Sequence, residues 1–364
     1  MMRYLFAGGG TGGHIFPAIA IADEIKILDP GAEILFVGAK GRIEEKIVPQ
    51  NNYMLETITI TGFSRVKFLN NISLPYKIMR SLIQSELIIR KFKPDVAVGT
   101  GGFVCGPVIL KARRMGVPVL IQEGNSFAGK TIKMLSRKAN KVVINFEETK
   151  NYLKRKDNII KISHPVRISL KAEDRNDSLS KFGLSDSGVT LFIFGGSQGA
   201  RAINDAVKKI IPGLYERNIN VIWQTGETDF DRISGMFTDK QDRIRIYKFI
   251  NDMSAAYSAS DLIICRAGIT SIMEIALLEK AAIVIPLPGS AEEHQVKNAM
   301  SLKKLNAAEV IFQHELGEKL LPEILRITGD KNLMSELKRN ISGISDKGAA
   351  KKIAEEIIKL IKAA

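Results

Sequence analysis

Short apolar runs alternate with amphipathic stretches along nearly the whole chain. In the first half, the apolar runs predict five strands, which are RYLFAG (3–8), EILFVG (33–38), DVAVGTGG (95–102), VPVLIQEG (117–124) and KVVINF (141–146). Strands that are apolar throughout, with no alternation of apolar and polar residues, are typical of a parallel sheet that is covered on both faces. The stretches between them have helical periodicity, and we expect the first helix, PAIAIADEIKI, to open at Pro17.

The second half repeats this plan. VTLFIFGG (189–196) runs into a glycine-rich loop, and further strand candidates follow at NVIWQTG (220–226), RIRIYKFI (243–250), DLIICRAG (261–268), AAIVIPLPG (281–289) and AAEVIFQ (307–313). The predicted fold class is therefore α/β, with two Rossmann-like, doubly wound parallel-sheet domains. Apolar periodicity lapses at KISHPVRISL (161–170), which gives expected domains 1–165 and 166–346, and the last stretch, 347–364, is an amphipathic helix.

Composition restricts the classes of protein that remain. The chain has 364 residues, enough for two domains, and 45% of them are hydrophobic and 25% charged, as in globular proteins. The two cysteines have no CxxC or Cys/His ligand spacing, which argues against a zinc site or a disulfide framework and suits a reducing cytoplasm. No apolar run has the length of a signal peptide or a membrane span.

The net charge of +14 is carried almost wholly by the first half. Residues 1–165 hold 25 Lys and Arg against 13 Asp and Glu, a net of +12, and the remainder holds 28 against 26, a net of +2. This asymmetry favours an anionic partner, which is a nucleic acid, an anionic membrane surface or an acidic substrate. A basic surface without a dedicated partner is the alternative.

Glycine is concentrated where predicted strands run into helices. The first loop, GGGTGGH (8–14), contains GxGxxG, but no acid follows the second strand to hold a ribose, so a dinucleotide site is not expected. Further glycine loops are GTGGFVCGP (99–107) and GGSQGA (195–200), and neither is a P-loop. Backbone without Cβ lets a ligand approach N–H groups at helix starts, so the loops predict a large anionic ligand such as a nucleotide diphosphate.

Polar side chains also follow the predicted strands, where open parallel sheets bind ligands. They are His14, Glu123, Asn125, Arg167, Glu274, His294 and Gln295. His14 has the chemistry of a general base, and a carboxylate such as Glu274 can hold ribose hydroxyls. Each residue alone fits a cap or a loop equally well, and their common position favours a ligand site in a cleft between the domains. No DxD motif lies at a strand end, so we expect no metal.

The residues at these places resemble the MurG family of peptidoglycan N-acetylglucosaminyltransferases over nearly the whole chain. The likeness rests on GGGTGGHIFPA, KPDVAVGTGGFVCGP, EGNSFAG, HPVR, GGSQGARAIN, FINDMSAAYSASDLIICRAG, SIMEIA and HQVKNA, in this order and spacing. It implies a GT-B fold, in which two Rossmann-like domains face a central cleft and the C-terminal helix (347–364) packs back on the first. It also implies an inverting transfer of N-acetylglucosamine from UDP-N-acetylglucosamine to the 4-hydroxyl of the muramyl sugar of lipid I, with no cofactor.

The resemblance further implies roles for individual residues. By this likeness Ile250 contacts the uracil through its backbone, and Glu274 binds the ribose. The other implied substrate-binding residues are Ile269, Thr270, Ser271, Ile272 and Met273 in the nucleotide pocket, Arg167 and Ser197 at the diphosphate, Asn125, His294 and Gln295 at the sugar, and Thr11, Gly12, Gly13 and His14 from the first domain.

Catalysis then needs a base for the acceptor hydroxyl and dipoles that stabilise the departing UDP. His14 is the first choice for the base, with Glu123 as a supporting or alternative group. The family usually has His-Glu-Gln-Asn where this chain has QEGN (122–125), and Asn-Pro-Val-Arg where it has HPVR (164–167). The family's histidine at position 122 is therefore absent and cannot be the base, and the change at position 164 concerns local packing.

A lipid acceptor in the cytoplasmic leaflet would explain the basic first half. The segment NISLPYKIMRSLIQSELIIRKFK (71–93) predicts a helix with apolar residues beside basic ones. These residues are Tyr76, Ile78, Met79, Leu82 and Ile83 near Lys77 and Arg80, flanked by Arg65 and Lys67. A core-facing helix with basic flanks is the alternative. We expect a peripheral contact with the anionic cytoplasmic face of the cell membrane, and no nucleic-acid partner.

Other functions fit parts of this pattern. Another lipid glycosyltransferase or a UDP-N-acetylglucosamine 2-epimerase would share the fold, although an epimerase needs neither a lipid acceptor nor a membrane-facing patch. A nucleotide-binding module or dinucleotide oxidoreductase would need the ribose acid that is missing after the second strand.

Overall fold

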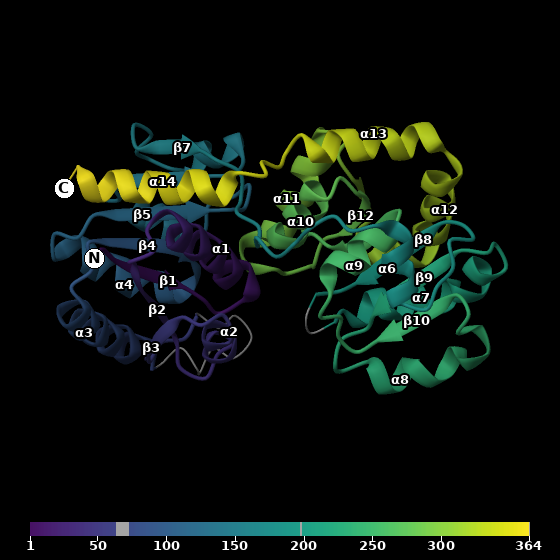
Figure 1. Cartoon of the computed structure of the whole chain (residues 1–364), viewed down its shortest axis with the longest axis horizontal. Helices are drawn as coiled ribbons and strands as arrows, with labels where there is room; N and C mark the ends of the chain where they lie inside the picture. The colour runs from purple at the N-terminus through teal and green to yellow at the C-terminus, as the bar shows by residue number, and fades with distance from the viewer. Residues whose placement is uncertain (63–72, 197–198, 364) are drawn as a thin grey trace. The chain divides into compact units, whose positions relative to one another are not determined.

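The computed structural model of the chain describes residues 1–62, 73–196 and 199–363. The chain divides into two compact units, Met1–Ile168 with Asp346–Ala364, and Ser169–Ser345. Each unit is built on one parallel sheet with helices on both faces (Figure 1). None of the described helices is long and apolar enough to cross a membrane.

The first unit contains a sheet with the strand order β3-β2-β1-β4-β5-β6-β7. Its strands are β1 (Arg3–Gly8), β2 (Glu33–Ala39), β3 (Met54–Ile58), β4 (Val96–Gly101), β5 (Val119–Glu123), β6 (Lys141–Ile144) and β7 (Ile159–Lys161). Its helices are α1 (Gly12–Leu28), α2 (Glu44–Gln50), α3 (Leu74–Phe92), α4 (Gly102–Arg114), α5 (Lys130–Ser136) and α14 (Ala349–Lys362).

The C-terminal helix completes the core of this first unit. Figure 1 shows α14, at the yellow end of the chain, alongside α1 at its purple start. Ile353 and Ile357 of α14 are fully buried in one cluster with Ile25 of α1 and Phe36 of β2. The cluster on the opposite face of the sheet includes residues of α3, α4 and α5. The apolar side of the terminal helix is therefore buried against residues more than three hundred positions earlier in the sequence.

The second unit has the strand order β10-β9-β8-β11-β12-β13. Its strands are β8 (Thr190–Phe194), β9 (Asn220–Gln224), β10 (Ile244–Tyr247), β11 (Leu262–Arg266), β12 (Ala281–Ile285) and β13 (Glu309–Val310). Its helices are α6 (Arg175–Lys181), α7 (Arg201–Tyr215), α8 (Phe230–Ser234), α9 (Met253–Ala259), α10 (Ile269–Leu277), α11 (His294–Lys304), α12 (Leu316–Gly329) and α13 (Lys331–Ser342). Trp223 is fully buried in a hydrophobic cluster of this unit.

Each predicted strand contains an observed one, and the strands that were not predicted lie at an edge. β3 pairs only with β2, and β7 pairs only with β6. An edge strand is exposed along one side, so it need not be apolar throughout, and the sequence MLETI of β3 is mixed accordingly.

The prediction that the first helix opens at Pro17 is wrong. α1 begins at Gly12, after the extended N-cap residue Thr11, and Pro17 lies inside it. The φ angle of proline fits a helix, but its ring crowds the backbone of the preceding turn. That turn begins with Gly12 and Gly13, whose backbone can adjust to the ring. His14 therefore lies in the first turn of the helix and not at the lip of the loop.

Candidate functional site

Both sheets are doubly wound, which means that successive strands are added first in one direction and then in the other. Ligands bind such sheets at the point where this direction reverses. In the first unit this point lies between β1 and β4, and in the second between β8 and β11. The glycine loops after β1, β4 and β8 and the start of α10 after β11 flank these points. Of the residues predicted to bind substrate, those at 11–14 follow β1 and those at 269–274 follow β11, whereas Asn125, Arg167, Ile250, His294 and Gln295 follow other strands.

The glycines of the first loop make room for side chains that pack against it from behind. A Cβ on Gly8 would lie 2.0 Å from Oγ1 of Thr100, and a Cβ on Gly9 would lie 1.9 Å from Oε1 of Glu44. The N–H of Gly10 donates to Oε1 of Glu44 at 2.8 Å. Packing within the unit thus accounts for part of the glycine surplus that was attributed to ligand approach.

His14 packs over the turn between β4 and α4. Its Nδ1 lies 3.1 Å from the backbone oxygen of Thr100, and the Thr100 hydroxyl donates to the backbone oxygen of His14 at 2.8 Å. Because a carbonyl only accepts, this contact places a proton on Nδ1 and leaves the lone pair of the neutral ring on Nε2. Gly101 has a φ of +105°, and a Cβ there would lie 2.7 Å from Nδ1, so this position requires glycine.

The start of α1 is accessible beside this ring. Thr11 is exposed, and Gly12, Gly13 and His14 are half-buried. Arg167 belongs to the same unit, and its guanidinium carbon lies 4.9 Å from the centre of the Phe16 ring, also on α1.

Glu123 holds the loop that follows β5. The residue is 5% exposed, and its Oε1 accepts from the backbone N of Asn125 at 3.0 Å and from Nδ2 of Asn125 at 2.9 Å. Its Oε2 accepts from the backbone N of Gly129 at 3.0 Å. Hydrogen bonds to a carboxylate stabilise its charged form, so Glu123 is better suited to hold Asn125 than to take a proton.

The two departures from the family pattern lie in one buried network. Nε2 of Gln122 donates to Nδ1 of His164 at 3.0 Å, and a Cβ on Gly124 would lie 2.2 Å from that same nitrogen. The imidazole of His164 therefore occupies the space that a side chain at position 124 would need. Burial, and then the charge of His14, lower the pKa of His164 to about 3, so this ring is neutral near pH 7.

In the second unit, Gln224 ties the glycine loop after β8 to the residue predicted to face the uracil. This glutamine ends β9 and is 3% exposed. Its Nε2 donates to the backbone oxygen of Gly196 at 3.2 Å, and its Oε1 accepts from the backbone N of Ile250 at 2.8 Å. Ser197 lies outside the described residues.

Glu274 is held from behind by a tyrosine. The hydroxyl of Tyr257, on α9, donates to Oε2 of Glu274 at 3.0 Å, and both side chains are buried. At the start of the same helix, α10, the side chains of Ile269, Ile272 and Met273 are buried. Thr270 and Ser271 are half-buried, and the hydroxyl oxygen of Thr270 is itself buried and has no hydrogen-bond partner among the described residues.

The turn before α11 has an unusual backbone. Glu292 and Glu293 have φ values of 54° and 57°, in the left-handed region. Non-glycine residues there cost about 1–3 kcal/mol each and cluster at functional sites. His294 begins α11, and Gln295 uses its Oε1 to accept from the backbone N of Leu287 at 3.0 Å. Both predicted sugar-binding residues of this turn are thus fixed in place next to the end of β12.

Two kinds of site find no support in this geometry. In the described parts of the chain, no group of His, Cys, Asp and Glu side chains could hold a metal ion. β2 ends at Ala39, and Glu33 lies at its other end, where it pairs with Arg3 at 3.0 Å. The carboxylate that a dinucleotide ribose needs is therefore on the wrong edge of the sheet.

Comparison with known proteins assigns the chain to a family. Residues 4–144 match the glycosyltransferase family 28 N-terminal domain, and residues 190–357 match the C-terminal domain. A UDP-N-acetylglucosamine--N-acetylmuramyl-(pentapeptide) pyrophosphoryl-undecaprenol N-acetylglucosamine transferase of Parabacteroides distasonis is 39% identical over 99% of this chain and 98% of the relative. A Bacteroides fragilis protein of the same name is 41% identical, over 99% and 96%. The chain belongs to the MurG family of glycosyltransferases.

A solved structure supports this assignment. The crystal structure of Acinetobacter baumannii MurG matches with a TM-score of 0.78 at 27% identity, covering 99% of this chain and 100% of that chain. The predicted α/β, GT-B fold class is thereby confirmed, together with the resemblance to the MurG family.

Sequence reasoning missed buried residues that contact the predicted site loops. Glu44, Thr100, Gln224 and Tyr257 are each at most 3% exposed and bond the loops described above. Thr100 and Gln224 end predicted strands, which is the signal that singled out Glu123. Glu44 lies on α2, 34 residues from Gly10, and Tyr257 lies on α9, 17 residues from Glu274, and no local pattern marks either of them.

A buried arginine was also missed. Arg266 ends β11 and donates to Oε1 of Gln313 at 2.8 Å and to the backbone oxygen of Pro286 at 3.4 Å. Burial lowers its pKa. The guanidinium of Arg266 therefore lies beside the carboxyl end of β12 and Gln313.

Proposed function

We propose that the chain transfers N-acetylglucosamine from UDP-N-acetylglucosamine to the 4-hydroxyl of the muramyl sugar of lipid I, which gives lipid II for peptidoglycan synthesis. The observation that carries this proposal is the end-to-end similarity, at 39% and 41% identity, to relatives named for that transfer. The enzyme is then a hexosyltransferase that needs only its two substrates.

The second unit holds the UDP moiety in this proposal. Glu274, oriented by Tyr257, accepts from the ribose hydroxyls. Because the N–H of Ile250 already donates to Gln224, its contact with the uracil uses the backbone carbonyl, which accepts from the imide N–H of the base. Ser197, Arg167 and the helix starts at α7 and α10 stabilise the diphosphate, and the Asn125, His294 and Gln295 side chains address the sugar.

His14 is the general base. Its Nε2 takes the proton of the acceptor hydroxyl while that oxygen bonds to the anomeric carbon and the bond from this carbon to UDP breaks, so the configuration is inverted. The contact between Nδ1 and Thr100 keeps the lone pair on Nε2. Glu123 accepts a hydrogen bond from the side chain of Asn125 and keeps it in place. This contact favours a supporting role for Glu123 over the role of general base.

The first unit meets the anionic cytoplasmic face of the membrane through α3. Tyr76, Met79, Ile83 and Leu87, which we call the α3 stripe, recur at helical spacing and are each more than half exposed, at 66%, 62%, 54% and 62%. α3 buries Ser81, Ser85 and Ile89. Because the four large apolar side chains of the stripe are exposed and two of the three buried residues of this helix are serines, a membrane contact is favoured over a core-facing helix.

The basic residues near the stripe fit the same contact. Lys77 and Arg80 lie on α3 beside it, and Leu82 is half-buried. Arg65 and Lys67 lie outside the described residues. Each well-placed cation contributes about 1 kcal/mol at an anionic surface, so the charge of the first unit strengthens the contact.

The test of the base is the variant His14→Ala. Its kcat for transfer to a lipid I analogue should fall by at least about a hundredfold, since a positioned base contributes 10²–10⁴ in rate. Its Kd for UDP-N-acetylglucosamine, from calorimetry, should stay within about threefold of the wild-type value. A near-normal kcat would remove His14 from this role, and an equal loss of kcat and donor affinity would make it a binding residue.

A further inference from the structure

Glu44 is a fully buried carboxylate behind the first glycine loop. It begins α2 and is 0% exposed. Its Oε1 accepts from the backbone N of Gly10 at 2.8 Å and from the backbone N of Ala39 at 3.3 Å. Its Oε2 has no hydrogen-bond partner among the described residues. Two N–H donors are few for a carboxylate that is removed from water.

Holding the loop does not require this charge. The N–H groups of Gly10 and Ala39 need only one acceptor oxygen, which the amide of a glutamine would supply in the same shape. A buried charge without a cation costs several kcal/mol, so a negative group here would be a burden if it served only to bridge two loops.

The carboxylate lies one residue away from the imidazole of His14. On one side of Gly9, a Cβ on that glycine would lie 1.9 Å from Oε1 of Glu44. Gly102 lies on the other side of Gly9. A Cβ on Gly102 would lie 2.1 Å from the backbone oxygen of Gly9 and 3.2 Å from Cδ2 of His14. Gly9 therefore lies between a contact with the Glu44 carboxylate and one with the turn that carries the His14 ring, and charge interactions away from water are weakly screened.

Among the described residues of this unit, His164 interacts electrostatically with His14, and Cys105, Glu123 and Arg167 are further ionisable groups. His164 is neutral, and burial raises the pKa of the Cys105 thiol to about 12, so neither carries charge near pH 7. The carboxylate of Glu123 is hydrogen-bonded to its own loop, and the guanidinium of Arg167 lies over Phe16.

We propose that Glu44 is a positioning residue whose buried negative charge stabilises the imidazolium that forms when His14 takes the acceptor proton. The proposal rests on the proposed role of His14 as the base. Its electrostatic part, a carboxylate that raises the pKa of His14, stands apart from turnover.

The decisive variant is Glu44→Gln, which keeps the shape and the acceptor oxygen and removes the charge. The full-length chain has four histidines, so 15N-imidazole NMR resolves each ring, and His14→Gln identifies the signal of His14. The pKa of His14 should fall by about one unit in Glu44→Gln. The kcat should fall roughly tenfold near pH 7, and its acid limb should move to lower pH, with the Kd for UDP-N-acetylglucosamine unchanged.

Two further variants separate charge from packing. Glu45→Gln changes the neighbouring acid, which is exposed and accepts from the backbone N of Gly41 at 3.0 Å, and it should leave the His14 pKa and kcat unchanged. Glu44→Asp keeps the charge, so the pKa of His14 in this variant should stay close to its wild-type value. A drop in Glu44→Asp as large as in Glu44→Gln would overturn the proposal, because packing and not charge would then be responsible.

The remaining outcomes are also decisive. An unchanged His14 pKa in folded Glu44→Gln overturns the electrostatic link whether or not the enzyme transfers sugar. A lowered pKa with unchanged kcat overturns the role in the reaction. If Glu44→Gln does not fold, 13C NMR of the wild-type Glu44 carboxyl replaces it, and a carboxyl that is protonated at pH 7 overturns the proposal, whereas an ionised one supports it.

Discussion

At the scale of single residues, the predicted substrate-binding groups are held by buried side chains behind them. Tyr257 orients Glu274, and Gln224 bonds both Gly196 and Ile250. The sequence marks the groups that stand at strand ends, because that position follows from the order of apolar runs. It does not mark their supports, because these come from other elements and meet their partners only in the fold.

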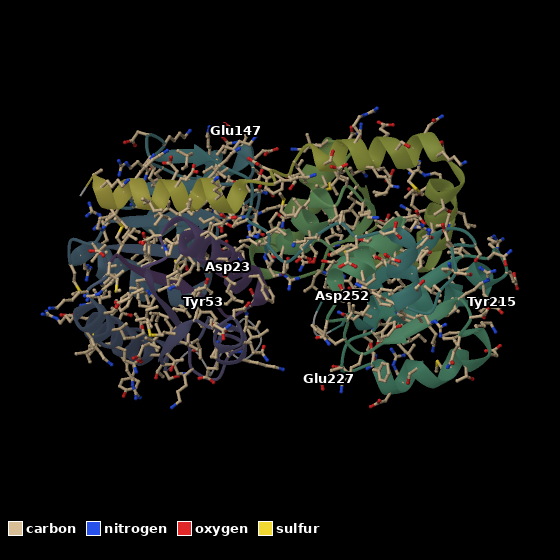
Figure 2. The ribbon with its side chains drawn as sticks, viewed as in Figure 1. Asp23, Tyr53, Glu147, Tyr215, Glu227 and Asp252 are labelled. Atoms are coloured by element: carbon tan, nitrogen blue, oxygen red, sulfur yellow. The ribbon has the colours of Figure 1, made fainter. Side chains whose placement is uncertain are left out.

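Tyr257→Phe tests whether such a support matters for donor binding. Removing a hydrogen bond to a charged group costs about 1.5 kcal/mol, so the Kd for UDP-N-acetylglucosamine should rise roughly tenfold in calorimetry. The matched control is Tyr53→Phe in the first unit, where the hydroxyl donates to Oδ1 of Asp23 at 2.6 Å (Figure 2). Equal Kd values for Tyr257→Phe and the wild type would contradict the assignment of Glu274 to the ribose.

His164 makes the stability of the first unit depend on pH. Its pKa is about 3 in the folded state and near 6.5 in the unfolded chain, so between these values the unfolded chain binds a proton that the folded one does not. The contribution is fully present above about pH 6.5 and is lost as pH falls toward 3. From pH 7.5 to pH 5 the free energy of unfolding should drop by about 2 kcal/mol from this group alone.

His164→Asn measures this contribution. Urea unfolding of the wild type and the variant at pH 7.5 and pH 5 should show a stability difference that shrinks by about 2 kcal/mol at the lower pH. A difference that is the same at both pH values would mean that His164 is protonated, or accessible to protons, in the folded unit.

At the scale of elements, the pattern of apolar runs predicts central strands better than edges and helix starts. The central strands are buried on both faces, and an uninterrupted apolar run records this directly. β3 and β7 are edges and carry no such run. The start of α1 was misplaced because Pro17 is a common first residue of a helix, whereas here the glycines before it already belong to the first turn.

The exposed face of α3 carries a prediction at this scale. Replacing three members of the α3 stripe, Met79, Ile83 and Leu87, by serine should weaken binding to phosphatidylglycerol vesicles by roughly tenfold or more, since each side chain loses apolar burial in the interface. Sedimentation with vesicles gives the partition coefficient. Turnover with a soluble acceptor analogue should be unaffected, because these three side chains are exposed on α3 and none of them belongs to the predicted site.

A triple serine variant elsewhere in the same unit controls for lost hydrophobicity. Ile27, Met54 and Met134 are 63%, 56% and 53% exposed and lie on other elements. This variant should bind vesicles like the wild type. Equal weakening in both triples would mean that the contact is not made by α3.

At the scale of the whole molecule, each unit has its own sheet and core, and the chain returns to the first unit at its end. The doubly wound class follows from the alternation of strands and helices alone. The sequence does not predict which element α14 packs against, because an amphipathic pattern shows which side of a helix is buried but not what covers it. In the structure, Ile353 and Ile357 of α14 lie against α1. The basic charge of the first half likewise indicates an anionic partner, and only the exposed α3 stripe favours a membrane among the possible ones.

The central claim is the transfer itself, and one assay tests it most directly. The purified full-length chain is incubated with UDP-N-acetylglucosamine labelled in the sugar and with a lipid I analogue, in buffer with a metal chelator. We predict a labelled disaccharide lipid with an inverted anomeric centre, and one UDP released for each sugar transferred. Labelled donor that binds the protein and yields no disaccharide lipid would contradict the account.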